Sequence, residues 1–73
     1  MKLENIIPGT TLQKDGVNYI VSSINGNYIY ALKLSSPNKV LPETILMTSL
    51  SEYKVVINIG DGNPIMYENI EIN

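Results

Sequence analysis

Hydrophobic and polar residues alternate along much of the chain, and short turn signals interrupt the alternation. Residues 17–24 and 27–34 alternate with a period of two, which is the period of a β-strand that presents side chains to two faces. Weaker patterns predict further strands over residues 10–14, 54–59 and 65–67 and an edge strand about Ile70 and Ile72. The pattern therefore predicts a chain made chiefly of strands.

Glycine, asparagine and proline mark the turns. Asp15-Gly16 and Asn25-Gly26 are pairs that tolerate positive φ. Asn25-Gly26 is typical of a type I′ hairpin turn, in which both central residues have positive φ. Two prolines predict a loop over residues 35–42, and Gly-Asp-Gly-Asn-Pro predicts a turn over residues 60–64. A turn at Asn25-Gly26 pairs Ile24 with Asn27 and continues to Val17 opposite Leu34.

This register divides the hairpin side chains between two faces. The predicted core face carries Val17, Tyr19, Val21, Tyr28, Tyr30, Leu32 and Leu34. The second face carries Ile20, Ile24, Ile29 and Ala31 within a ring of polar residues. A small barrel buries one face of its hairpin, so an apolar second face indicates either a partner surface or a C-terminal segment folded over it through Ile70 and Ile72.

We therefore predict an interface or binding site on the second face, and we add one tyrosine to it. Tyr28 lies beside the turn, opposite Ser23, and is the tyrosine expected to reach solvent. The candidate site residues are Ile20, Ile24, Ile29, Ala31 and Tyr28.

Residues 43–53 support two interpretations. Leucine and tyrosine residues at helical spacing favour one helix across the whole segment. The alternative is a strand over residues 44–47 followed by a single helical turn, in which Ser49 is the N-cap and Glu52 completes a capping box. Three β-branched residues in the segment favour the strand and turn.

The composition predicts the all-β class. Ile, Val and Thr supply 20 residues and alanine appears once, which favours a pleated sheet over helices. We expect one domain over residues 1–73, built as a small antiparallel barrel or rolled sheet of about five strands with at most one short helical segment.

The order of motifs resembles an SH3-like small β-barrel. The resemblance rests on Pro-Gly-Thr-Thr-Leu at residues 8–12, Asp15-Gly16, Tyr-Ile-Val at residues 19–21, and the turn over residues 49–53 between two strands. It implies a module that binds protein, peptide or nucleic acid. The chain lacks the aromatic and acidic loop clusters of peptide-binding SH3 domains.

The inventory of reactive residues argues against catalysis. The chain has no cysteine and no histidine, so it lacks disulfides, zinc ligand sets, and Ser-His-Asp or Cys-His arrangements. No phosphate-binding loop motif is present either. We expect a protein that is not an enzyme and uses no cofactor or metal.

The charge of the chain and its distribution limit the classes of partner that we expect. The net charge is −2, with five lysines and no arginine, which disfavours nucleic acid as a partner. Lys2 and Glu4 stand where a signal peptide would need apolar residues, and no apolar run is long enough to span a membrane. Of the two charged residues, Glu4 is the acid that argues against a signal peptide, so we expect a cytoplasmic protein with no membrane contact.

The size and composition suggest how such a protein acts. At 73 residues the free energy of apolar burial roughly offsets the conformational entropy, so self-association or a partner is the expected further source of stability. Ile, Asn, Lys and Tyr make up 30 residues, and their A/T-rich codons suggest a low-GC bacterium or its phage. The leading hypothesis is a phage or mobile-element accessory protein that self-associates and contacts a host protein. The alternative is an oligomeric protein that sequesters a small nucleotide-like ligand.

Overall fold

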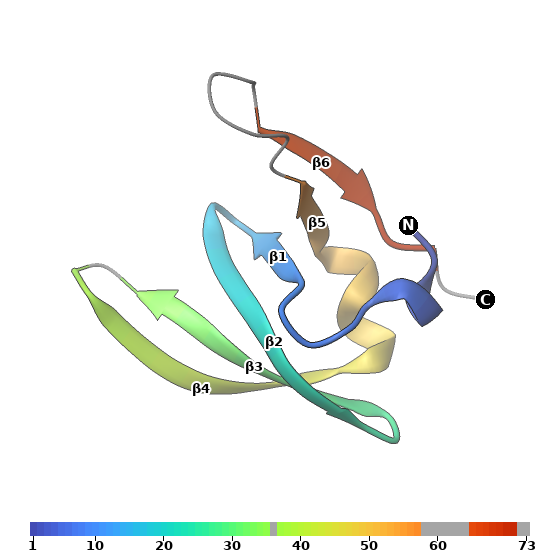
Figure 1. Ribbon diagram of the computed structural model, residues 1–73, viewed down its shortest axis with the longest axis horizontal. Coiled ribbons are helices and arrows are strands. Elements are labelled where there is room, and N and C mark those ends of the chain that lie inside the picture. Colours follow the sequence, from blue (N-terminus) through green and yellow to red (C-terminus); the bar gives the residue numbers. More distant parts are fainter. Residues whose placement is uncertain (36, 58–64, 72–73) are drawn as a thin grey trace.

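The computed structural model describes residues 1–35, 37–57 and 65–71. They form one antiparallel sheet of six strands in the order β4-β3-β2-β1-β5-β6, with β4 and β6 at its two edges (Figure 1). The strands are β1 (Thr11–Lys14), β2 (Val17–Asn25), β3 (Tyr28–Ser35), β4 (Lys39–Leu46), β5 (Lys54–Ile57) and β6 (Met66–Asn69). Two short 3-10 segments, η1 (Leu3–Asn5) and η2 (Met47–Glu52), are the helical elements of the described chain. The predicted all-β class is confirmed.

The first hairpin follows its turn signal. Asp15 has a φ of 51° and Gly16 a φ of 78°, and Lys14 pairs with Val17 directly across them. Positive φ at both central residues is the requirement of a type I′ turn, which Asp-Gly satisfies at little cost. The predicted turn at this position is confirmed.

The second hairpin turns one residue later than predicted. Asn25 pairs with Tyr28, so Gly26 and Asn27 form the two-residue loop, and of these only Gly26 has positive φ, at 59°. Glycine at the first central position is the pattern of a type II′ turn. The expectation that Asn25 adopts positive φ, and that Ile24 faces Asn27, is wrong.

A β-bulge in β2 changes the faces of this hairpin. Ser23 pairs with Tyr30 while Val21 pairs with Ala31, which leaves Ser22 without an opposite residue. The later turn alone moves the pairing by two residues and leaves the faces as predicted. The extra residue at Ser22 moves it back by one, so the net shift over the first half of β2 is one residue. A shift by one exchanges the two faces.

Because of this exchange, the residues of β3 expected opposite the core lie on the same side as the core residues in the first half of β2. Ile29 and Ala31 lie on the same side of the sheet as Tyr19 and Val21 and are buried with them. The Ser22 hydroxyl donates a hydrogen bond of 2.9 Å to the carbonyl oxygen of Tyr30, at the position where the strand bends. The bulge therefore satisfies a backbone acceptor while it realigns the strand.

The segment after β3 is more extended than the predicted loop over residues 35–42. Asn38 has a φ of 58°, and β4 begins at the next residue and runs through Pro42, which pairs with Leu32. An edge strand tolerates proline because proline has no backbone N–H to donate, and on the outer side of an edge strand no hydrogen bond to another strand is lost.

The strand-and-turn interpretation of residues 43–53 is confirmed. β4 ends at Leu46, and η2 follows directly and ends before Tyr53. The predicted capping box is wrong, because η2 begins at Met47 and its N-cap, Leu46, makes no side-chain hydrogen bond. The predicted turn over residues 60–64, together with residues 58, 59 and 72, lies outside the described chain.

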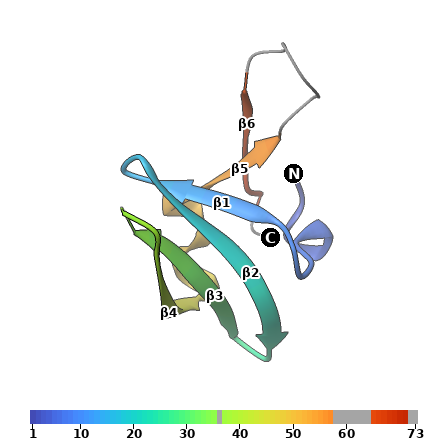
Figure 2. The same ribbon diagram turned by 60° about the vertical axis from the view of Figure 1, so that its left-hand side comes forward.

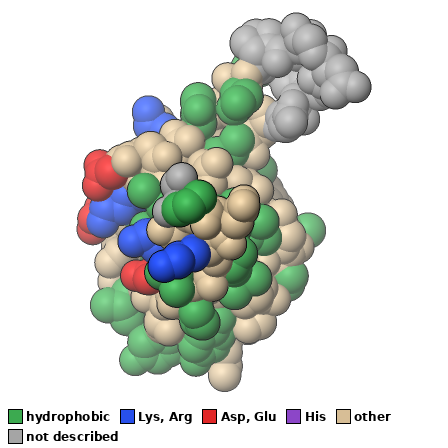
Figure 3. All heavy atoms as spheres, turned by 90° about the vertical axis from the view of Figure 1, so that its left-hand side faces the viewer, with side chains coloured by type: hydrophobic (Ala, Val, Ile, Leu, Met, Phe, Trp, Pro, Cys, Tyr) green, Lys and Arg blue, Asp and Glu red, His purple; other side chains and the backbone are tan. Residues whose placement is uncertain are grey.

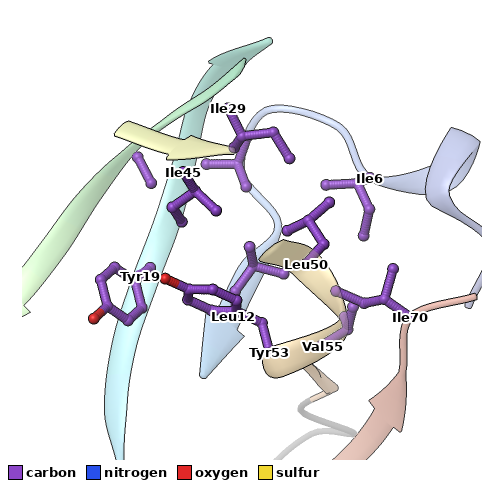
Figure 4. Close-up of a cluster of buried hydrophobic side chains, with 11 residues drawn as sticks. Ile6, Leu12, Tyr19, Ile29, Ile45, Leu50, Tyr53, Val55 and Ile70 are labelled. Atoms are coloured by element: carbon purple, nitrogen blue, oxygen red, sulfur yellow. The ribbon is translucent and has the colours of Figure 1, made fainter. Parts of the chain in front are cut away.

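The core lies between η2 and the curved sheet. The sheet twists strongly from β4 to β6 (Figure 2), and side chains from the strands and from η2 converge in its hollow (Figure 4). The buried hydrophobic residues are Ile6, Leu12, Tyr19, Val21, Ile29, Ala31, Ile45, Leu50, Tyr53, Val55 and Ile70. We call the side of β2, β3 and β4 that faces this cluster the inner face, and the opposite side the outer face.

The first residues of the chain pack beside the segment after β6. The Leu3 amide donates to the carbonyl oxygen of Glu71 at 3.2 Å, and the Glu71 amide donates to that of Met1 at 2.8 Å. These contacts hold Ile6 and Ile70 over the same core that buries Ile29.

Candidate functional site

The five residues predicted as an interface do not form one patch. Ile29 and Ala31 are 0% and 2% exposed and belong to the core. Ile20 and Tyr28 lie on the outer face, because Ile20 pairs with Leu32 and the outward side chains of β3 follow at every second position. Ile24 pairs with Ile29 on the inner face, near the hairpin end, where it is 37% exposed. The physical reason for the correction is the bulge at Ser22.

The outer face is built from three strands whose register aligns their outward side chains in rows. Paired residues in an antiparallel sheet lie on the same face, so the pairs that include an outward residue of β3 define it. Its members are Asn18, Ile20, Ser23 and Asn25 on β2, Tyr28, Tyr30, Leu32 and Leu34 on β3, and Val40, Pro42, Thr44 and Leu46 on β4. None of these twelve side chains carries a charge.

Six large apolar side chains on this face are exposed. Their exposed fractions are 47% for Tyr28, 38% for Tyr30, 36% for Leu32, 38% for Leu34, 53% for Val40 and 49% for Leu46. At roughly 200 Å² for each complete side chain, these fractions correspond to an exposed area of about 500 Å². A patch of that size is as large as the largest patch on a typical monomer, and such patches are commonly binding sites.

The charged residues of the same strands lie on the other face. Lys33 pairs with Tyr19, Glu43 pairs with Ala31, and Lys39 pairs with Ser35, so all three belong to the inner side. The end view of the molecule shows hydrophobic side chains gathered over its lower part, apart from most of the lysine and acidic side chains (Figure 3). The alternation of the strands therefore separates charge from the outer face.

Polar groups border the outer face on the β1 side. Gln13 Nε2 donates a hydrogen bond of 3.0 Å to Asn18 Oδ1, and the two residues pair directly between β1 and β2. A polar rim around an apolar centre is the usual arrangement of a protein interface.

The free edge beside the outer face is less suited to binding. β4 is an edge strand, and Pro42 in its middle has no N–H to donate to an added strand. Proline on an edge strand is one of the means by which proteins prevent uncontrolled strand pairing. Contact through the face is therefore better supported than contact through this edge.

A second group of interacting side chains lies around Tyr53. Lys14 Nζ lies 2.8 Å from Glu52 Oε1 and 5.4 Å from the centroid of the Tyr53 ring. The Tyr53 ring meets Tyr19 edge to face, with 5.4 Å between centroids and 75° between planes. These contacts fix η2 against β1 and β2 at one side of the core.

The protonation chemistry of this group points to a structural role. The hydrogen bond and the charge of Glu52 raise the pKa of Lys14, and burial raises the pKa of Tyr53. Both shifts move these groups further from neutral pH, whereas a general acid or base works best with a pKa near the working pH. The arrangement stabilises packing and offers no obvious proton-transfer group.

A cavity of about 560 Å³ lies at the opposite end of the inner face from Tyr53. Its apolar lining comes from Leu3, Ile6, Ile24 and Met47, and its charged lining from Lys2, Glu4 and Glu71. Two carboxylates against one ammonium group disfavour a phosphate or another anion there. Ile24 is the one predicted site residue that reaches this cavity.

Sequence reasoning missed most of the outer face. The register expected from the sequence puts Tyr30, Leu32 and Leu34 on the core face and Val40 in a loop, whereas all four lie on the outer face. A signal for the bulge is present, because Val21 and Ile24 lie three positions apart, whereas two residues on the same face of a regular strand lie an even number of positions apart. Two consecutive serines stand at that interruption.

Within residues 1–35, 37–57 and 65–71, no three His, Cys, Asp or Glu side chains lie close enough together to hold a metal ion. In the same part of the chain, every helical segment is too short to cross a bilayer. No protein-family model, no curated protein and no solved structure matches this chain.

Proposed function

We propose that this domain is a non-catalytic interaction protein that binds other proteins through the outer face of β2, β3 and β4. The observation that carries the proposal is an uncharged face of twelve side chains, six of them large, apolar and exposed. Depletion of charge at the centre, with aromatic residues present, is the compositional signature of a protein interface. In this proposal the protein self-associates, contacts a host protein in the cytoplasm, and belongs to a phage or mobile element.

The order of the strands supports a relation to SH3-like small barrels. β1 and β2 form a hairpin, β2, β3 and β4 form a meander, and β5 returns beside β1 after the helical turn η2. The sequence resemblance implied a small barrel, whereas the described strands form an open sheet with β4 and β6 at its edges. Such folds carry unrelated functions, so the relation supports a binding module and leaves the choice of partner to the surface.

The alternative function, sequestration of a small nucleotide-like ligand between subunits, has less support. The cavity beside Ile24 has two carboxylates in its lining, and the outer face has no positive charge to pair with a phosphate. A thermal-shift screen against nucleotides separates the two functions, because a ligand that binds the folded state raises the melting temperature. We expect no nucleotide to stabilise the protein.

The proposal is tested by asking what touches each face in a living cell. A photo-crosslinking amino acid at position 32 places the probe on the outer face, and the same amino acid at position 43 places it on the exposed inner side of β4. We expect protein adducts, with this chain or with another, at position 32 and few at position 43. Adducts of equal yield at both positions, or none at position 32, would contradict the proposal.

A further inference from the structure

We infer that the occupant of the outer face is a second copy of this chain, related by a two-fold axis that passes near Tyr30 and Leu32. The inference rests on the proposed function and names the partner of the same surface. Three observations support it: the outer face carries no charge, its area suits a small dimer, and the edge strand β4 beside it contains a proline.

The absence of charge favours a partner identical to the chain itself. In a two-fold interface the same patch meets itself, so a charge near the axis would lie close to its own copy and repel it. The outer face avoids this, because the charged residues of β3 and β4, namely Lys33, Lys39 and Glu43, all lie on the inner side. A partner recognised by charge would instead need complementary charges on this face.

The area of the face suits a small two-fold dimer. The six exposed apolar side chains supply about 500 Å², and a stable interface of standard size needs about 800 Å² from each partner. Ile20, Pro42 and the polar side chains of the same face surround the apolar centre and supply the remainder. An interface that uses the whole face therefore reaches the required size without any other surface.

Face-to-face contact also agrees with the edge of the sheet. The alternative dimer would join two β4 strands edge to edge, and Pro42 would interrupt the added ladder at its middle. Contact between outer faces needs no backbone hydrogen bonds, so Pro42 packs there as one more apolar side chain.

The position of the axis follows from the pattern of side chains. Along β3, Tyr28 and Tyr30 form one half of the apolar row, and Leu32 and Leu34 form the other. The centre of the row lies between Tyr30 and Leu32, and the largest contact results when the two centres coincide. Residue 32 of one copy therefore lies near residue 32 of the other, which gives the dimer a signature that no heterologous complex shares.

The experiment is a charge-reversal rescue at this position, measured by sedimentation velocity over a range of protein concentrations. Wild-type protein is expected to form a dimer that dissociates on dilution. Leu32→Lys and Leu32→Glu are each expected to raise the dimer dissociation constant by at least about a hundred-fold, because like charges meet across the axis. An equimolar mixture of the two variants is expected to recover the dimer.

Controls keep the test independent of folding. Glu43→Lys reverses a charge on the inner side of β4 and is expected to leave the dimer intact. Each Leu32 variant is expected to keep the far-ultraviolet circular dichroism spectrum of the wild type. If either one loses it, Thr44→Lys and Thr44→Glu place the same charges beside Tyr30 on the outer face and repeat the measurement.

Three results would overturn the inference: a wild-type monomer at every concentration, a dimer that Leu32→Lys leaves unchanged, or a mixture of the charged variants that stays monomeric. A wild-type monomer that forms crosslinks from position 32 to a different protein would contradict the dimer but would support the proposed function. If position 32 gives no crosslinks and the protein forms no dimer, both the dimer and the proposed function are contradicted.

Discussion

The two faces of β3 are made from similar residues and have opposite roles. Ile29 and Ala31 are buried in the core, whereas Tyr30 and Leu32, at the alternate positions, remain more than a third exposed. Hydropathy does not distinguish the two sets, because both are apolar. The difference is set by which side of the strand faces η2, and that side is fixed by a single unpaired residue, Ser22, in the neighbouring strand.

The largest expected effect comes from placing the same charge on each of the two faces. Ile29→Lys puts an ammonium group into a fully buried site, which removes the packing of an isoleucine and leaves a charge without a partner. We expect a loss of more than about 4 kcal/mol, comparable with the whole stability of a small domain. Thermal denaturation followed by circular dichroism measures it.

Leu32→Lys is the matched variant on the outer face. In dilute solution its melting temperature is expected to change by the equivalent of no more than about 1 kcal/mol, because the new side chain reaches water. Equal destabilisation by the two substitutions would mean that the faces are not distinct, and a stable Ile29→Lys variant would mean that they are reversed.

The next effect concerns the turn that ends the hairpin. Gly26 has a φ of 59°, and a Cβ there would meet no atom within 4 Å, so the cost of Gly26→Val comes from the backbone and not from a clash. We expect a loss of about 1 kcal/mol or more, because a β-branched residue resists positive φ. Chemical denaturation gives the difference.

Asn25→Val is the informative comparison for the turn. Asn25 lies in β2 and pairs with Tyr28, where valine is a favourable strand residue. We expect Asn25→Val to cost much less than Gly26→Val. If the two substitutions cost the same, the loop is Asn25-Gly26 and the register reported for this hairpin is incorrect.

Local chemistry explains why much of the fold could be predicted from sequence. The strands, the Asp15-Gly16 turn and the strand followed by a helical turn before Tyr53 all follow from propensities and turn residues that act over a few positions. The face assignment could not be derived in this way, because it depends on long-range packing. Because Ser22 has no partner on β3, Val21 and Ile24 both lie on the inner face, where Val21 is buried in the same cluster as Leu50.

The wrong face assignment also changed the residues predicted for the interface. An uninterrupted register groups Ile29 and Ala31 with Ile20. In the structure Ile20 and Tyr28 lie on the outer face, whereas Ile29 and Ala31 are buried in the core. Sequence could indicate that one hairpin face is buried and that the other is apolar. It could not decide which was which, because the energy that decides is the burial of β3 against residues from β1, η2 and β5.

A smaller effect is expected from removing the bulge. Val21 and Ser23 pair with adjacent residues of β3, so deletion of Ser22 joins them in a regular strand and leaves every buried side chain on its side. The loss is the hydrogen bond from Ser22 to the Tyr30 carbonyl, worth at most about 1 kcal/mol at an exposed site. The melting temperature of the deletion variant measures this loss.

Deletion of Ile20 is the control for this prediction. It would bring Tyr19 next to Val21, and neighbouring residues of a strand point to opposite faces. One of two buried side chains would then leave the core, so we expect a loss of several kcal/mol, as in large core truncations. Unfolding of the Ser22 deletion variant, with a stable Ile20 deletion variant, would refute the bulge.

The smallest effect is a pH dependence at the inner side of the sheet. Burial raises the pKa of Tyr53 above its ordinary value of 10.0, so the folded state favours the neutral phenol. Its contribution to stability is fully present below about pH 10 and is lost as the pH rises through the raised pKa. The pKa of Lys14 is raised by Glu52, so its contribution is also lost at alkaline pH.

Tyr53→Phe separates these contributions. The variant has no phenol to ionise at position 53, so its melting temperature is expected to fall less steeply between pH 9 and pH 11 than that of the wild type. Superimposable profiles for Tyr53→Phe and the wild type would show that Tyr53 ionises as freely when folded as when unfolded.

The most direct test of the two-face account is a scan of single cysteines along β3, which the absence of native cysteine makes clean. Cysteine replaces residues 28–32 one at a time, and the rate of reaction with a maleimide is measured under native conditions in dilute solution. The account predicts fast labelling at positions 28, 30 and 32 and strong protection at positions 29 and 31. The opposite alternation, or uniform labelling along the strand, would contradict it.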